Sequence, residues 1–378
     1  MSTLPASNIF PYHFFKTKHI SPESYYYLKL ISNIFQGSML VVFFILLVKT
    51  NLNNSIIELV YSVSSHFYIS LLLYLFVVIF SIHIILTPLK FLNEFLLEKI
   101  SHLSNQSVRN WVLDVIKKNI IGIFLLFPIL LVFAFLIKSS DLWWLYFSFF
   151  LFFYSTLLGT VFPDMILPFF YKLKPIEGNE LKERLLKVAE KLNLRIDGVY
   201  QIDFSKDSKK ANAALVGMGK SKKIILTDTL LNNFDDKEIT AVFAHECGHI
   251  NYHHIQKNLI ISLLTFLFQF KVGEVVYRSV LDGATNYNPQ ILKGIPYLLL
   301  TVTLLNFILT PFLNGISRYF EYQADHFAWN ITGKTDWLAK SLIKLASINK
   351  IYKDPPVILE WFFLSHPSVV NRIKKITS

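Results

Sequence analysis

Two histidines and a glutamate stand at a spacing that can hold a metal ion. His245, Glu246 and His249 form an HExxH motif within DDKEITAVFAHECGHINYHH. Residues four apart on an α-helix share a face and lie about 6 Å apart along its axis, so both imidazoles can reach one tetrahedral ion. Glu246 lies beside that ion, where its carboxylate can take a proton from zinc-bound water. Cys247 is about 200° around the helix from His245 and cannot join.

A third metal ligand must come from elsewhere, because His253, next in the same row, lies about 12 Å from His245 along a straight helix. The stretch SRYFEYQADHFAWN offers Glu321, with His326 as the competing ligand. Residue chemistry favours Glu321, but His326 stays open because both residue types bind zinc. The pattern predicts one Zn²⁺ per chain.

Two alternatives involve no metal chemistry. The HExxH helix could carry two hydrogen-bonded core histidines, since short motifs also occur by chance. The second stretch could be a surface ion-pair face in which Glu321 and Asp325 meet Arg318. If the motif binds metal, Asp325 instead becomes a group that orients an imidazole from behind.

The elements that must position these residues are largely membrane helices. The chain of 378 residues is 53% hydrophobic and only 17% charged, with a mean hydropathy of +0.44. Soluble domains carry about 25% charged residues, which excludes a soluble enzyme. A span needs roughly 20 apolar residues. Six stretches qualify, near residues 31–48, 67–88, 120–137, 142–162, 259–281 and 295–313.

The distribution of Lys and Arg predicts the orientation. These residues number fifteen in segment 163–258 and nine after residue 313, but only one in each of the alternate gaps between spans. The positive-inside rule therefore places both termini and segment 163–258 in the cytoplasm. A bacterial cytoplasmic membrane is favoured, or the endoplasmic reticulum if the source is eukaryotic. The net charge of +11 then reflects topology and anionic lipid, and it calls for no nucleic-acid partner.

The predicted fold is mainly α, a multi-pass bundle of about six spans with a cytoplasmic catalytic portion that contains a small β-sheet. Within that portion ELKERLLKVAEKLNL predicts an amphipathic helix, GVYQIDF and KKIILTDTLL predict strands, and Asp235 or Asp236 caps the HExxH helix. Five segments follow: an N-terminal segment 1–30, spans one to four in 31–162 with an amphipathic surface helix at 89–118, catalytic segment 163–258, spans five and six in 259–313, and C-terminal catalytic segment 314–378.

Five motifs, in a fixed order along the chain, resemble those of a known family. VFPDMILPFFYKLKPIEGNEL, KKANAALVGMGKSKKIILTDTLL, HECGH, EYQAD and SHPSVVNRI follow one another along the chain. Over residues 20–378 the chain resembles the type I CAAX prenyl endopeptidases, a family of integral-membrane gluzincin zinc proteases. Bacterial membrane proteases of the HtpX type are shorter cousins that share HExxH and the downstream glutamate.

The resemblance implies a set of site residues. His245, His249 and Glu321 would bind zinc, and Glu246 would be the general base that activates water. Asn212, in NAALVG, would lie beside the strand that binds substrate. His366, in SHPS, would stabilise the tetrahedral intermediate. Supporting positions around the ligands would be Asp325, His254 and Arg372.

The implied substrate is a prenylated C-terminal CaaX peptide that is cleaved at the membrane, so the partners are a peptide or protein and the lipid bilayer. Two rivals remain: a quality-control protease without a lipid requirement, and a non-catalytic zinc-binding membrane protein. No pattern specifies an oligomeric state. The chain departs from the family in showing six spans rather than seven, with the first family helix absent, and in carrying Cys247 where a larger apolar residue is usual.

Overall fold

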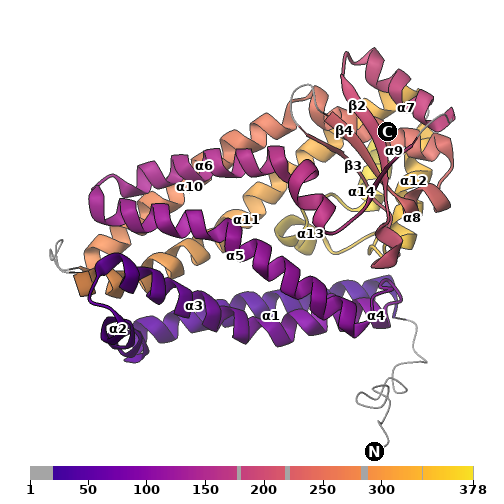
Figure 1. Ribbon diagram of the computed structural model, residues 1–378. Helices are drawn as coiled ribbons and strands as arrows, with labels where there is room; N and C mark the ends of the chain where they lie inside the picture. Colours follow the sequence, from indigo (N-terminus) through magenta and orange to yellow (C-terminus); the bar gives the residue numbers. More distant parts are fainter. Residues whose placement is uncertain (1–19, 177–179, 218–221, 282–287, 334, 378) are drawn as a thin grey trace, which may run out of the picture.

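The computed structural model describes residues 20–176, 180–217, 222–281, 288–333 and 335–377. An elongated helical bundle leads at one end into a smaller portion that contains a sheet (Figure 1). The predicted architecture, mainly α with a small β-sheet, is therefore confirmed. The predicted N-terminal segment 1–30 lies outside the described residues up to residue 19, and its remainder forms the start of the first helix.

Six described helices are long and apolar enough to cross a membrane, which confirms the six predicted spans. Five of them are longer than their predicted apolar stretches, because further turns continue the helix at one or both ends, whereas α6 lies within its stretch. The helices are α1 (Pro22–Lys49), α3 (Phe67–Lys90), α5 (Val108–Ser139), α6 (Trp143–Val161), α10 (His254–Val280) and α11 (Asn288–Thr332).

The six helices form a ring in which each packs mainly against two neighbours, in the order α1, α3, α5, α6, α10, α11 and back to α1, and α3 also contacts α11. The ring thus closes between α1 and α11 with six members. A short helix, α2 (Leu52–Val63), packs on α1, α3 and α11 at the end far from the sheet (Figure 1). There the buried Tyr74 hydroxyl donates to Asn53 Oδ1 at 2.6 Å.

Several predicted segment limits fall inside continuous helices. After Pro88, α3 continues through a π-helical turn, η3 (Phe91–Leu96), into α4 (Leu97–Ile100), and α5 begins at Val108. The separate surface helix expected over 89–118 is therefore wrong, because its two halves extend neighbouring spans. Likewise α11 runs without a break across residue 313, so the last span and the EYQAD motif share one rigid helix.

The catalytic portion contains a four-stranded sheet in the order β1-β2-β4-β3. β2 runs parallel to β4, whereas β3 pairs antiparallel with β4 and, among the described residues, has no strand on its other side. GVYQIDF and KKIILTDTLL do contain strands, as predicted, but the other two strands of the sheet were not predicted as strands. The strands are β1 (Leu173–Pro175), β2 (Ile196–Ile202), β3 (Ala213–Val216) and β4 (Lys222–Thr227).

The helices of this portion pack on the sheet around one apolar core. Leu185, Ile224, Phe243 and Cys247 are all buried in it, so the lone thiol is a core residue. Burial raises the pKa of Cys247, which keeps it a neutral thiol. The elements are η4 (Phe162–Ile166), η5 (Leu167–Phe169), α7 (Glu180–Lys191), η6 (Phe204–Lys206), α8 (Asp228–Asn233), α9 (Asp236–Asn251), α12 (Thr335–Ile348), α13 (Val357–Phe363) and α14 (Val369–Thr377).

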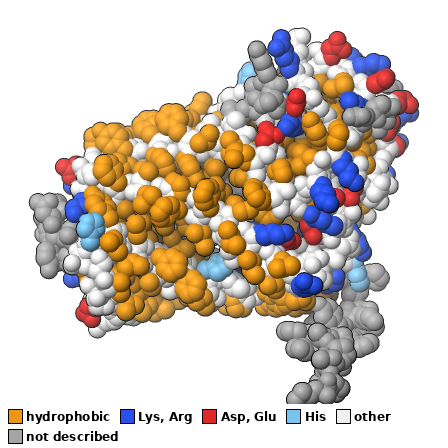
Figure 2. Space-filling view, in the orientation of Figure 1, with side chains coloured by type: hydrophobic (Ala, Val, Ile, Leu, Met, Phe, Trp, Pro, Cys, Tyr) orange, Lys and Arg blue, Asp and Glu red, His pale blue; other side chains and the backbone are white. Residues whose placement is uncertain are grey.

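The surface divides along the same boundary. Figure 2 shows hydrophobic side chains covering the bundle, whereas Lys, Arg, Asp and Glu gather over the catalytic portion. Exposed apolar side chains such as Phe124, Phe153 and Ile260 would be unfavourable in water. They match the lipid-facing wall of a multi-pass membrane protein.

Candidate metal centre

Helix α9 carries the HExxH motif and is held by a cap and a core. Glu238 N donates to Asp235 Oδ1 at 2.8 Å, and Asp235 N donates to Glu238 Oε2 at 3.0 Å. This capping box settles the N-cap at Asp235 rather than Asp236. Ile239 and Phe243 are 1% exposed and turn one face of the helix into the core. The opposite face, with both motif histidines, is thereby directed at α11.

Helices α9 and α11 touch backbone to backbone at a glycine. A Cβ placed on Gly248 would come within 2.8 Å of Ala324 Cα and 3.1 Å of Ala324 O. Real Cβ atoms do not approach so closely, so a residue without a side chain is needed here. The close approach lets Glu321 on α11 reach His245 and His249 on α9.

The ligand atoms of three side chains converge at tetrahedral spacing. His245 Nε2 lies 3.3 Å from His249 Nε2 and 3.3 Å from Glu321 Oε2, and His249 Nε2 lies 3.4 Å from Glu321 Oε1. Ligands at 2.0 to 2.1 Å from one tetrahedral ion are separated by about 3.3 to 3.4 Å. Glu321 is 4% exposed, yet its Oε2 has no hydrogen-bond partner among the described residues. The donor set therefore fits a metal ion.

Asp325 and Arg372 hold the first histidine from behind. Asp325 Oδ1 lies 2.8 Å from His245 Nδ1, and Arg372 binds both Asp325 oxygens at 2.6 and 2.8 Å. Nδ1 of His245 is therefore the protonated nitrogen, and Nε2 is free to act as a ligand. Burial lowers the pKa of His245, but Asp325 and Glu321 outweigh it and raise that pKa to about 9. The site thus favours a positive charge at this position, which a metal ion supplies.

A second chain of contacts orients the other histidine and includes a residue that sequence reasoning missed. His249 Nδ1 lies 2.9 Å from His254 Nδ1, and His254 Nε2 lies 3.0 Å from Gln323 Oε1. Gln323 Nε2 in turn donates to Tyr319 Oη at 3.2 Å, so its oxygen faces His254. This order leaves His249 Nε2 without a proton and ready to bind metal. The His254 ring also stacks on the Phe320 ring, with 4.2 Å between the ring centroids. The only sequence signal for Gln323 was its place in EYQAD.

The remaining predicted site residues lie at different distances from the cluster. Glu246 follows His245 on α9 and is half-buried, and burial raises the pKa of its carboxyl group. The half-exposed side of the cluster is bordered by His366, whose Nδ1 lies 3.0 Å from Glu321 Oε1. Asn212 precedes β3, and its Oδ1 accepts from Ala213 N at 3.0 Å. The structure thus places Asn212 at the edge strand and not among the ligand atoms.

The competing interpretations of the EYQAD stretch do not match the contacts. His326 is exposed and lies 3.2 Å from Asn330 Nδ2, on a different face from Glu321. Arg318 donates to the carbonyl oxygens of Glu360 and Leu364 at 2.9 and 2.6 Å. It therefore anchors α13, and among the described residues Glu321 and Asp325 pair with Arg372, so the alternative of an ion-pair face with Arg318 does not hold.

We expect Gly248→Ala to weaken metal binding without removing a ligand. The added methyl group would push α9 away from α11, which overpacking data put at about 1 to 3 kcal/mol of stability. Zinc affinity, measured by competition with a chromogenic chelator, should fall at least about tenfold. Gly122→Ala is the matched control, since a Cβ at Gly122 on α5 meets nothing within 4 Å. Equal zinc affinity in both variants would contradict the packing argument.

Comparison with known proteins agrees with this geometry. The family model for peptidase family M48 matches residues 175–378. A second model, described as the CAAX prenyl protease N-terminal region with five membrane helices, matches residues 9–172. Within 20–172 the described residues form four helices of spanning length.

Individual relatives point the same way. The chain is 33% identical to the uncharacterized metalloprotease YhfN of Bacillus subtilis over 72% of this chain and 65% of that protein. It is 32% identical to CAAX prenyl protease 1 of Saccharomyces cerevisiae over 76% and 67%, respectively. This chain therefore spans about two thirds of the length of these relatives.

A solved structure shares the fold. The crystal structure of S. mikatae Ste24p superposes with a TM-score of 0.75 at 29% identity, over 83% of this chain and 77% of that one. The M48 model covers more than half of the residues here, including every candidate ligand. The chain therefore belongs to peptidase family M48, and it is a multi-pass membrane metalloprotease related to the CAAX prenyl proteases.

Proposed function

We propose that the metal is zinc and that the protein is an endopeptidase acting on peptides held at the membrane. The observation that carries this proposal is a cluster of three ligands among the described residues, with Glu246 next to His245 on α9 and close enough to interact electrostatically with all three. Structural zinc sites are closed by four protein ligands, whereas catalytic sites leave one position open for water or substrate. The open position weighs against a non-catalytic zinc protein.

Each group at the site has a separate role in peptide hydrolysis. Zinc, when bound, acts as a Lewis acid and lowers the pKa of water toward about 7. Glu246 accepts the proton of the attacking water and later delivers it to the leaving amine. A carboxyl group whose pKa is raised by burial suits both steps. His366, on the exposed side next to Glu321, can donate to the oxyanion of the tetrahedral intermediate.

Strand β3 is the proposed support for the substrate backbone. It is one of the two edge strands of the sheet, packs against α9, and begins directly after Asn212. An extended peptide can bind such an edge through backbone hydrogen bonds. In this proposal Asn212 shapes the start of the strand through its bond to Ala213 N.

The proposed substrate is a prenylated CaaX peptide. Two lines support this class: relatives named CAAX prenyl protease 1, and a cluster built where α9 and α11 meet the apolar bundle. We further propose that the site faces the cytoplasm and that the membrane is a bacterial cytoplasmic membrane, since one relative is bacterial. The charged end of the molecule, which contains the site, supports that side under the positive-inside rule (Figure 2).

The test is cleavage of a fluorescence-quenched CaaX peptide with and without its farnesyl group. We expect a kcat/KM at least about tenfold higher for the farnesylated peptide, since each buried CH₂ contributes about 0.8 kcal/mol to partition. Cleavage should occur with inside-out but not right-side-out vesicles from expressing bacteria. Equal cleavage of both peptides would instead support a quality-control protease, and cleavage only by right-side-out vesicles would reverse the orientation.

A further inference from the structure

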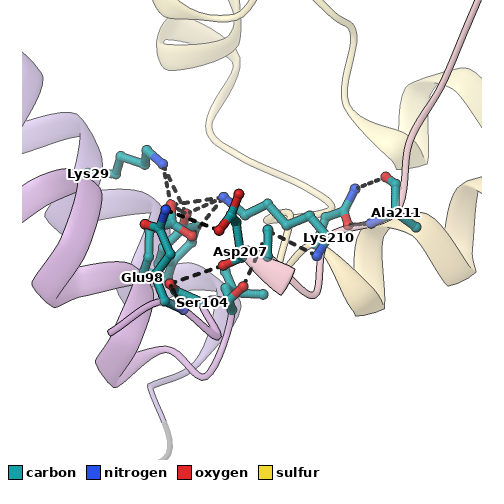
Figure 3. Close-up of polar contacts among 11 residues, drawn as sticks. Lys29, Glu98, Ser104, Asp207, Lys210 and Ala211 are labelled. Atoms are coloured by element: carbon teal, nitrogen blue, oxygen red, sulfur yellow. Dashed lines mark hydrogen bonds and ion pairs between the residues drawn. The ribbon is translucent and has the colours of Figure 1, made fainter. Parts of the chain in front are cut away.

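A second buried charged cluster lies where the membrane bundle meets the catalytic portion. Glu98, on α4, is 9% exposed and accepts hydrogen bonds from Tyr25, Lys29 and Lys210. The two ammonium nitrogens lie 2.7 and 2.8 Å from its carboxylate. Figure 3 shows Lys29 and Lys210 approaching Glu98 from opposite sides. The carboxylate therefore joins a membrane helix, α1, to the chain that enters the sheet.

A short backbone pairing lies beside the cluster and strengthens the same junction. Ser104 and Ser208 form an isolated antiparallel bridge. Lys209 N donates to Leu103 O at 2.8 Å, and Asn105 N donates to Asp207 O at 3.0 Å. The turn between α4 and α5 thus holds the segment that leads to Lys210 (Figure 3).

Lys210 stands two residues before Asn212, and the intervening backbone is bound on both sides. Thr229 Oγ1 donates to Lys210 O at 2.6 Å. Both backbone groups of Ala211 bond the Asn349 side chain, at 2.9 and 3.0 Å. A shift of Lys210 would therefore be transmitted directly to the start of β3.

The charges make this junction sensitive to a single substitution. Glu98 compensates two lysine ammonium groups that are partly buried, and burial lowers the pKa of Lys210. Without the carboxylate the two like charges would face each other at low dielectric, and the flexible lysines would turn toward water. The Lys210 side chain would then no longer contact the bundle.

We propose that Glu98 is a positioning residue that, through Lys210, fixes the position of edge strand β3 relative to the membrane helices. The inference rests on the proposed function, in which β3 holds the peptide while the bundle holds its lipid. A substrate anchored at both places needs a set distance between them. A misplacement of about 1 Å can lower the rate about 100-fold.

The experiment compares Glu98→Gln with Glu274→Gln in the full-length protein. Glu274 is a matched control because it is 4% exposed and pairs with Lys271 and Arg278. It lies about 30 Å along α10 from the start of that helix at His254. We expect Glu98→Gln to lower kcat for the farnesylated peptide at least about tenfold, with unchanged zinc content. Glu274→Gln should keep kcat within about twofold.

Three further variants separate positioning from general stability. Lys210→Met should reproduce the loss, Lys210→Arg should retain activity, and the double variant Glu98→Gln with Lys210→Met should be no worse than either single one. Additive losses, or equal losses in the Glu274→Gln control, would overturn the proposal.

Hydrogen exchange provides a readout that does not depend on peptide cleavage. Amides of residues 209–216 should exchange at least about tenfold faster in Glu98→Gln than in the unmutated protein or Glu274→Gln. Unchanged exchange would overturn the inference whatever the activity. If the unmutated protein cleaves no peptide while exchange responds as expected, the proposed function fails and the positioning link stands.

Discussion

Glu246→Gln should leave the metal in place and abolish turnover. The substitution keeps the size of the side chain but removes the carboxylate that accepts a proton from water, and general acid–base groups contribute about 10² to 10⁴-fold to rate. We therefore expect kcat for the farnesylated CaaX peptide to fall by about 10³-fold or more. Zinc should remain at one ion per chain, because the three ligand atoms come from His245, His249 and Glu321.

The measurement pairs steady-state kinetics with elemental analysis of the same purified sample. Glu190→Gln on α7 makes the same chemical change at an exposed position outside the site. It should retain both activity and zinc. Turnover of Glu246→Gln within tenfold of that of the unmutated protein would contradict the general-base role. Loss of zinc would show that Glu246 supports the ligands instead.

Glu321→Ala should abolish tight metal binding. The carboxylate is 4% exposed, approaches both histidines, and has a buried oxygen without a hydrogen-bond partner among the described residues. Its removal leaves two ligands, too few for a stable tetrahedral zinc site. We expect zinc affinity to fall more than about 100-fold, with activity lost in proportion, as measured by chelator competition.

The loss of zinc affinity in Glu321→Ala can be compared with that in Asp325→Asn. Asp325 contacts His245 Nδ1 and not the ligand atoms, and substitution of such outer partners typically lowers metal affinity about 10- to 100-fold. Glu321→Ala should therefore bind zinc more weakly than Asp325→Asn. The reverse order would mean that Glu321 is not a ligand, and a folded Glu321→Ala protein with unchanged zinc affinity would refute the site as drawn.

Much of the fold follows from local pattern. Apolar stretches of about 20 residues predicted all six spans, because a bilayer leaves a helix as the only way to satisfy the backbone over that length. The capping box and the apolar stripe of α9 were also readable, since both depend on residues three or four apart. The prediction of a surface helix over 89–118 was wrong because amphipathic spacing does not distinguish a surface helix from the solvent-exposed end of a longer span.

The site was only partly readable for the same reason. HExxH places two ligands on one helix face by periodicity alone, and the ordered motifs indicated Glu321, but residue chemistry could not exclude His326. The choice depends on how α11 meets α9, which Gly248 permits by its lack of a side chain. That contact joins residues 76 positions apart in the chain, from Gly248 to Ala324, and no local pattern encodes it.

Composition, periodicity and motif order were sufficient for the class of protein, its spans and the HExxH pair, because these are properties of neighbouring residues. The hydrogen bonds that set each histidine tautomer, including the one to Gln323, and the tie between Glu98 and Lys210 required the folded chain. They join helices and loops that are distant in sequence. Such contacts depend on packing geometry, where a shift of one ångström decides whether a bond forms.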